Sequence, residues 1–142
     1  MEERREYLLA LDGGTGSFRA ILFQKDGVQK AIEQIEWEHP VYDEYPGSVG
    51  FDFEKNWEII QRCIRNLIEK NNIAPEDIKG ISTDSMREGF ILYDENQKEL
   101  IGFSNIDARA KEEVISLKRE HPTLEMEIYL ETGETFALSA VP

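Results

Sequence analysis

An acidic residue followed by a glycine-rich turn is the stretch of this sequence best suited to binding a charged ligand. Asp12 is followed directly by Gly13, Gly14, Thr15, Gly16 and Ser17. Glycine allows positive φ angles, so such a turn can aim several N–H groups at one point, and this concavity suits a phosphate. The Asp12 carboxylate can hold a hydrated Mg²⁺ that bridges to the phosphates. The stretch therefore predicts a phosphate site with a metal-binding acid at its edge.

Apolar runs on both sides of the turn, residues 7–11 and 18–23, predict two paired antiparallel strands. The turn lacks the Gly-Lys-Ser/Thr ending of a P-loop. It also lacks the third glycine of a Rossmann turn, and it leads into a strand rather than a helix. The alternative is an ordinary glycine hairpin in which Asp12 only caps a strand, and the turn alone leaves both interpretations open.

A third strand is expected over residues 28–37, and a long loop over residues 38–52. The aromatic residues of this loop, Tyr42, Tyr45 and Phe51, either line a pocket or anchor the loop, and anchoring is the commoner use of loop aromatics.

The rest of the chain predicts two further helical regions around a strand and a hairpin. A helix from residue 52 to about residue 72 is expected to bury Trp57, Ile60, Ile64, Leu67 and Ile68. The next elements are a helical turn at 75–77, a buried strand at 78–84 and a hairpin of 89–93 with 100–103. Two helices follow, at 108–120 and at 124–131, and Gly133 marks the end of the second one.

The composition restricts the partners of the chain. Its 142 residues are about the size of one domain. The formal charge of −13 argues against nucleic acid and against anionic membranes, because both would repel the protein. Cys63 is the only cysteine and falls in the predicted helix, so we expect a small buried side chain. The sequence shows neither a signal-peptide core nor a membrane-spanning apolar run, so we expect a cytoplasmic protein.

Arg87 and Glu88 follow the predicted strand 78–84 and can offer a hydroxyl-rich ligand both a donor fork and an acceptor. A sugar or polyol fits this pair. The alternative is a solvated ion pair in a loop, which the residues alone favour.

Three segments together resemble the FGGY carbohydrate kinases. Residues 11–19 are similar to the first phosphate-binding hairpin of that family, and residues 82–89 and 104–110 fall where the family keeps its sugar-contacting motifs. Within the family, these segments and residues 132–140 are most similar to the autoinducer-2 kinases.

The resemblance implies an α/β fold: an actin-like ATPase (ribonuclease-H-like) domain with a mixed sheet, antiparallel hairpins and flanking helices. Residues 1–142 would be the first part of the N-terminal, sugar-binding FGGY kinase domain. The fold would be incomplete and the C-terminal domain absent.

The implied chemistry is transfer of the γ-phosphoryl group of ATP to a hydroxyl, with ATP and Mg²⁺ as cofactors. Phosphate binding would fall to Gly13, Gly14, Thr15, Gly16, Ser17 and Arg19, with Asp12 for the metal. The resemblance places substrate binding at Arg87, Glu88, Asn105 and Asp107, with Arg109 bracing Asp107. Asn105 stands where pentulose kinases of the family usually have Trp, which favours the small linear dihydroxypentanedione (autoinducer-2) over a xylulose-type sugar. A neighbouring ketose or polyol stays open.

The family's catalytic base is expected beyond Pro142, so the chain alone is expected to be inactive. One alternative is a sugar-binding or interaction module without catalysis. Another is a complete enzyme that uses Asp12, Asp84 or Asp107 as its base. The missing kinase half, or a second copy of the chain, is the expected protein partner, because an incomplete domain exposes apolar surface.

Overall fold

A computed structural model describes residues 5–139 of the protein. These residues divide into two units: the first contains residues 5–38 and 53–86, and the second contains residues 39–52 and 87–139.

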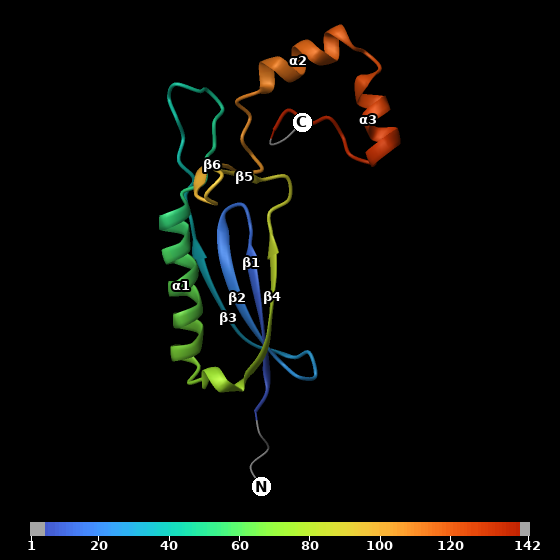
Figure 1. Cartoon of the computed structure of the whole chain (residues 1–142). Helices are drawn as coiled ribbons and strands as arrows, with labels where there is room; N and C mark the ends of the chain where they lie inside the picture. Colours follow the sequence, from blue (N-terminus) through green and yellow to red (C-terminus); the bar gives the residue numbers. More distant parts are fainter. Residues whose placement is uncertain (1–4, 140–142) are drawn as a thin grey trace. The chain divides into compact units, whose positions relative to one another are not determined.

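The first unit is built on a four-stranded mixed sheet in the order β3-β2-β1-β4 (Figure 1). Its strands are β1 (Tyr7–Gly13), β2 (Ser17–Gln24), β3 (Gln29–Glu36) and β4 (Ile78–Ser85). β1, β2 and β3 are antiparallel neighbours, and β4 lies parallel to β1. The predicted opening hairpin and third strand are therefore confirmed. The parallel strand places the carboxyl ends of β1 and β4 at one end of the sheet, beside the glycine-rich turn.

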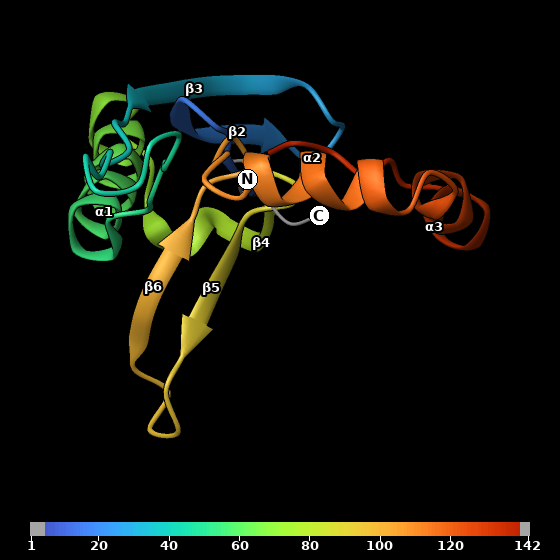
Figure 2. The ribbon, with the colours of Figure 1, turned by 90° about the horizontal axis from the view of Figure 1, so that it is seen from above.

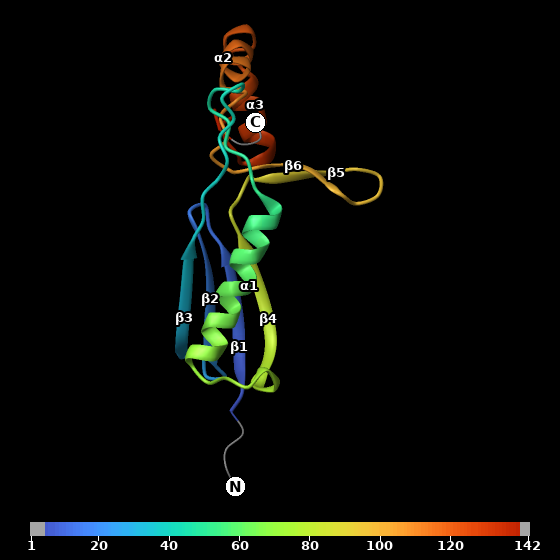
Figure 3. The same ribbon diagram turned by 90° about the vertical axis from the view of Figure 1, so that its left-hand side faces the viewer.

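Helix α1 (Phe53–Lys70) packs along one face of this sheet against β2 and β3 (Figures 1 and 3). The sheet residues buried in the core include Leu9, Phe18, Ala20 and Leu22, and α1 buries Asn56, Ile59, Cys63 and Leu67. The expected burial of Cys63 is confirmed.

The predicted core face of α1 was wrong at its start, because Trp57 is 59% exposed. Asn56 and Ile59 are buried instead. Two apolar stripes run side by side on this helix, displaced by one residue, and a displacement of one residue turns the helix by about 100°. Periodicity alone did not identify the stripe that meets the sheet.

A short 3-10 helix, η1 (Pro75–Asp77), leads into β4 as predicted, but the expected burial of β4 was wrong. Most of its residues are exposed, and Ile81 is 65% exposed. β4 is an edge strand of this sheet. The position of the strand was therefore predicted correctly. Its burial was not, because burial depends on which elements pack against the strand, and the strand's own sequence does not encode them.

The second unit contains the hairpin of β5 (Phe90–Tyr93) and β6 (Glu99–Phe103), which lie side by side in Figure 2. Helices α2 (Lys111–Glu120) and α3 (Leu124–Thr132) follow. Gly133 ends α3 with a φ of 76°, as its predicted C-cap role requires.

The first of these helices begins three residues later than predicted. Ala108 donates its N–H to Gly47 O (2.8 Å) and accepts a bond from Lys111 N–H, so this segment forms a turn held by the 39–52 loop.

Among residues 5–139, no helix combines the length and the apolar character needed to cross a membrane.

Candidate functional site

Asp12 and Arg19 lie opposite each other at the turn end of the β1–β2 hairpin, one position before Gly13 and Phe18. Arg19 Nη1 lies 3.4 Å from Asp12 Oδ2, and the side chains are 41% and 32% exposed, respectively. Arg19 also has a buried Nε that finds no hydrogen-bond acceptor among the described residues. The pair is therefore loose, and both members keep capacity to bind a ligand.

Trp37, which directly follows β3, supports the glycine-rich turn through three hydrogen bonds. Its Nε1 donates to the carbonyl oxygens of Gly14 and Thr15, both at 3.1 Å, and its backbone N–H donates to Gly16 O (3.2 Å). The sequence predicted Trp37 only as the last residue of a strand, and its role at the turn was not predicted. The sequence feature that could have indicated this role is the tryptophan itself. A buried indole N–H usually finds an acceptor, and the carbonyl oxygens of a neighbouring turn can provide one.

The glycines of the turn do not use positive φ angles, which corrects the reason given for them in the sequence analysis. Space explains them better. A Cβ on Gly13 would lie 3.5 Å from the Trp37 ring, and one on Gly14 would lie 3.4 Å from Ser17 O. A Cβ on Gly16 would meet nothing within 4 Å, so the tip of the turn is open to an approaching group.

Asp84 on β4 is the register partner of Asp12 on β1. Because side chains on paired residues of neighbouring strands leave the sheet on the same face, Asp12, Arg19 and Asp84 form one row. The Oδ1 atom of Asp84 accepts the N–H of Ser85. This row contains two carboxylates and one guanidinium at the edge of the turn.

The donor chemistry of this row fits Mg²⁺, which prefers oxygen ligands, keeps several waters and is usually held by one or two carboxylates together with substrate phosphates. Asp12 would hold such an ion, and the glycine-rich turn would face the phosphates bound to that ion. Within residues 5–139 no group of three or more His, Cys, Asp or Glu side chains is arranged to hold a metal by itself.

In the second unit, Arg87 and Glu88 are exposed and lie in a tight turn before β5. Gly89 N–H donates to Arg87 O (2.8 Å), and Glu88 has a φ of 64°, which is unusual for a residue other than glycine. Such conformations cost of the order of 1–3 kcal/mol and concentrate at functional sites.

Asp107 is buried, and both of its carboxylate oxygens accept hydrogen bonds. Val49 N–H donates to Oδ2 at 2.7 Å. The Arg109 guanidinium binds both oxygens, with Nε at 3.0 Å from each and Nη2 at 2.7 Å from Oδ2, and the Arg109 N–H reaches Oδ1 at 3.2 Å. The predicted bracing of Asp107 by Arg109 is observed.

Burial raises the pKa of Asp107, but the hydrogen bonds from Arg109 and Val49 outweigh burial and hold this pKa below its ordinary value. The carboxylate is therefore ionised and fully used within the protein. This environment suits a charge that fixes structure.

Asn105 lies in the same turn as Asp107. Its Oδ1 accepts a bond from the buried Ser104 hydroxyl (3.2 Å), and Ser104 N–H donates to Val49 O (2.9 Å). Thus Asn105 and Asp107 are both tied to the 39–52 loop. Of that loop's aromatics, Tyr42 and Tyr45 keep exposed rings.

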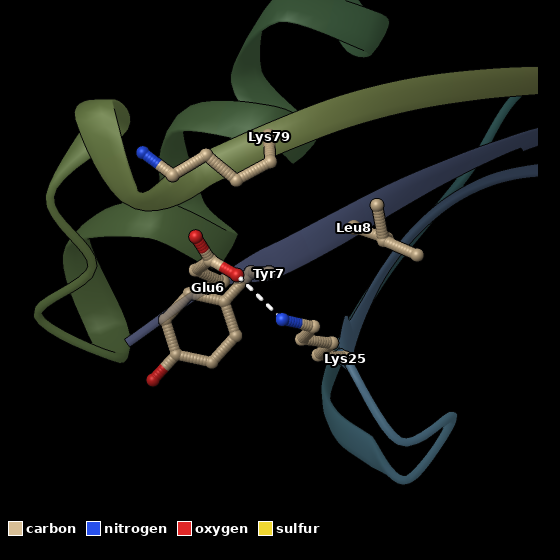
Figure 4. Close-up of a pocket in the computed structure, with 5 residues that line it drawn as sticks. All are labelled: Glu6, Tyr7, Leu8, Lys25 and Lys79. Carbon is tan, nitrogen blue, oxygen red and sulfur yellow. Dashed lines mark ion pairs between the residues drawn. The ribbon is translucent and has the colours of Figure 1, made fainter. Parts of the chain in front are cut away.

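A separate shallow pocket of about 200 Å³ lies at the start of β1, the end of the sheet opposite the glycine-rich turn (Figure 4). It is lined by Glu6, Tyr7, Leu8, Lys25 and Lys79, and contains one ion pair, between Lys25 Nζ and Glu6 Oε2 at 3.3 Å. None of the predicted site residues lies there.

With this geometry in view, residues 7–139 match the model of the N-terminal domain of the FGGY family of carbohydrate kinases. The chain belongs to this family. Residues 11–19, with the glycine-rich turn, and residues 82–89 and 104–110, with the turn around Asp107, lie within the matched range. The segment 132–140 lies within it except for residue 140, which is outside the described residues.

Curated relatives of this FGGY domain include autoinducer-2 kinases. The protein of that name from Escherichia coli strain K12 is 46% identical over 143 residues, and that from Salmonella paratyphi A is 45% identical over 141 residues. The alignments cover 100% and 99% of this chain but 27% of each relative. The chain thus spans about a quarter of the length of these relatives.

Solved structures confirm the predicted fold class. Gluconate kinase from Lactobacillus acidophilus superposes with a TM-score of 0.74 at 22% identity, covering 93% of this chain and 26% of that one. Xylulose kinase from Rhodospirillum rubrum also gives 0.74, at 21% identity, covering 94% and 27%. The FGGY domain therefore has part of an actin-like, ribonuclease-H-like fold.

Proposed function

We propose that this chain supplies phosphate-binding and substrate-binding groups of an ATP-dependent carbohydrate kinase. The observation that carries the proposal is the turn end of the β1–β2 hairpin in a member of the FGGY family. There a partly exposed carboxylate, a partly exposed guanidinium and an uncrowded glycine tip lie together. Phosphoryl transfer depends mainly on positioning and on neutralising charge, and these groups provide both.

In this proposal the residues from Gly13 to Ser17 surround the phosphates of ATP, and Asp12 holds Mg²⁺ through water. Arg19 reaches a phosphate oxygen with its partly exposed guanidinium, because a guanidinium binds phosphate with directed donors. Trp37 keeps the turn in shape by binding the carbonyl oxygens of Gly14 and Thr15. Mg²⁺ would reduce the repulsion between the phosphates and the incoming hydroxyl.

The substrate groups belong to the second unit. Arg87 and Glu88 bind hydroxyl or carbonyl oxygens of the substrate, and Asn105 contributes an amide from the neighbouring turn. Asp107 belongs to the same turn as Asn105 and supports this pocket. The curated relatives at 45–46% identity are named for autoinducer-2, and we propose dihydroxypentanedione as the substrate in preference to a cyclic sugar.

The hydroxyl proton needs a base, which we assign to the part of the kinase that lies outside the 27% of the relatives matched here. The protein partner is therefore the remaining part of such a kinase. Since the reaction consumes ATP, the proposal places the protein in the cytoplasm.

The test is an assay of ADP release with Mg-ATP and a panel of dihydroxypentanedione, xylulose and glycerol. The chain is assayed alone and after addition of the separately produced remainder of the E. coli autoinducer-2 kinase. The proposal predicts substrate-dependent ADP release only in the mixture, with the highest kcat/KM for dihydroxypentanedione.

Three other outcomes would change the proposal. Turnover by the chain alone would place the base within it and make Asp84 the next residue to replace. Binding of dihydroxypentanedione without turnover in the mixture would favour a non-catalytic binding module. Neither binding nor turnover would contradict the proposed function.

A further inference from the structure

The turn around Asp107, within residues 104–110, fixes a second segment of the same unit, the 39–52 loop. Through Val49 N–H it fixes the 39–52 loop, and the same loop is bound by Ala108 N–H to Gly47 O. Gly47 has a φ of 85°, and a Cβ there would lie 3.0 Å from Ala108 O, so loop and turn are in close contact. The loop thus depends on the turn at two successive points.

A second connection leads from Asp107 toward Glu88. Asp107 orients the Arg109 guanidinium, which lies 4.4 Å from the centre of the Phe103 ring on β6. The Phe103 ring stacks on Phe90, at the start of β5, with centroids 4.5 Å apart. Phe90 is two residues from Glu88. A continuous series of contacts therefore runs from the Asp107 carboxylate to the strained turn at Glu88.

The Arg109 guanidinium also faces two exposed rings of the loop. Tyr42 and Tyr45 have their centroids 5.7 Å and 5.8 Å from Arg109 Cζ, within the range of cation–π attraction. Arg109 is thus bound by one carboxylate and three rings, and it joins the loop to β6. A lysine offers a point charge without the planar fork and cannot reproduce these contacts.

We propose that Asp107 is a positioning residue that acts through Arg109 and Val49 to fix the 39–52 loop and the Glu88 turn, and that it makes no direct contact with the substrate. This inference rests on the proposed function for the role of Glu88. The carboxylate has no oxygen left without a protein donor and is 4% exposed as a residue. Arg87 and Glu88 are exposed and therefore accessible to a substrate.

The first test is hydrogen exchange of the full 142-residue chain without ligand. In Asp107→Asn the amide of Val49 should exchange about tenfold faster, because a charge-assisted bond becomes a neutral one. Arg109→Lys should accelerate the same amide several-fold. Asp43→Asn, which removes an exposed acid from the same loop, is the matched control and should change nothing. Unchanged protection of Val49 in a folded Asp107→Asn protein would overturn the inference. If Asp107→Asn does not fold, as judged by circular dichroism, Arg109→Lys decides in the same way.

The second test separates positioning from direct contact. Dissociation constants for dihydroxypentanedione are measured for Asp107→Asn, Arg109→Lys and the double variant. Positioning through Arg109 predicts that each single change weakens binding about fivefold or more and that the double variant is little worse than either. Loss of affinity in Asp107→Asn with full affinity in Arg109→Lys would show direct contact and overturn the inference. If the unmodified chain binds no dihydroxypentanedione and the mixture shows no turnover, the proposed function fails, and the exchange experiment still decides the role of Asp107 in the loop.

Discussion

The two units of this domain each contain an Asp–Arg pair, and the two pairs differ in almost every physical property. Asp12 and Arg19 approach at a single point, 3.4 Å apart, with about a third or more of each side chain exposed. Asp107 and Arg109 form a forked contact with a shortest distance of 2.7 Å, and their side chains are 5% and 21% exposed. Equal residue types therefore occupy opposite environments.

The difference shows which pair is available for a ligand. An exposed pair at a single contact contributes little to stability, typically below about 1 kcal/mol, and can exchange its partner for a phosphate or a metal ion. A buried pair with all its bonds made cannot release a partner without leaving an uncompensated charge. We therefore assign binding chemistry to Asp12 and Arg19, and structure to Asp107 and Arg109.

Replacement of Asp107 and of Asp12 by alanine should give the largest difference in stability between the two pairs. Asp107→Ala leaves Arg109 without its carboxylate and Val49 N–H without an acceptor, so we expect the free energy of unfolding to fall by about 3 kcal/mol. Asp12→Ala should change it by less than about 0.5 kcal/mol. Urea denaturation followed by circular dichroism measures both. Equal losses in the two variants would remove the distinction between the pairs.

Replacement of the arginines by lysine should give a smaller contrast in the same direction. Arg109→Lys loses the fork and the stacking on Phe103, and we expect a loss of roughly 1–2 kcal/mol in the free energy of unfolding. Arg19→Lys keeps the charge beside Asp12 and should be neutral within about 0.5 kcal/mol. A fully stable Arg109→Lys protein would mean that Asp107 needs only a positive charge nearby.

The contribution of the buried Asp107–Arg109 pair to the free energy of unfolding should depend on pH, because the folded state changes the proton affinity of Asp107. The pKa of Asp107 is lowered in the folded state, so its contribution is fully present above the ordinary aspartate pKa and is lost as the pH falls through the lowered value. Unfolding free energies measured between pH 7 and pH 2 should therefore fall less steeply below about pH 4 in Asp107→Asn than in the unmodified chain.

Glu33 provides the comparison in the first unit. A hydrogen bond from Lys70 lowers the pKa of Glu33, with burial opposing it, so Glu33→Gln should also reduce the acid sensitivity. An acid transition that is the same in Asp107→Asn and in the unmodified chain would show that folding does not lower the pKa of Asp107.

The smallest effect on stability is expected at the tip of the glycine-rich turn. A Cβ on Gly16 meets nothing within 4 Å, so Gly16→Ala should leave the free energy of unfolding within about 0.5 kcal/mol of the unmodified value. The added methyl group stands where a phosphate would approach, and Mg-ATP affinity should fall several-fold. Unchanged affinity, measured by calorimetry, would place the nucleotide away from the tip.

Local sequence predicted much of the fold and of the exposed site. The two apolar runs and the glycine-rich turn located β1 and β2, and the register of this hairpin then brings Asp12 opposite Arg19, a pairing that was not predicted. Contacts between distant residues were not predictable in this way. The Trp37 side chain reaches Gly14 across 23 positions, and Val49 reaches Asp107 across 58.

Burial was the other property that local pattern left undecided. Trp57 and Ile81 have the side chains of core residues but are 59% and 65% exposed. Asn56 has a polar side chain and is buried on α1. A residue's burial depends on which other element packs against it, and neither the helix nor the strand encodes that partner. The environment of Asp107 was missed for the same reason.

The most direct test of the phosphate assignment uses Trp37 as a probe. Trp57→Phe replaces the exposed one of the two tryptophans and leaves Trp37, whose indole binds the glycine-rich turn. Titration of this variant with Mg-ATP should change its fluorescence saturably, and Asp12→Asn in the same background should weaken the apparent affinity about tenfold or more. A titration with no saturable change, or an affinity that Asp12→Asn does not alter, would contradict the account.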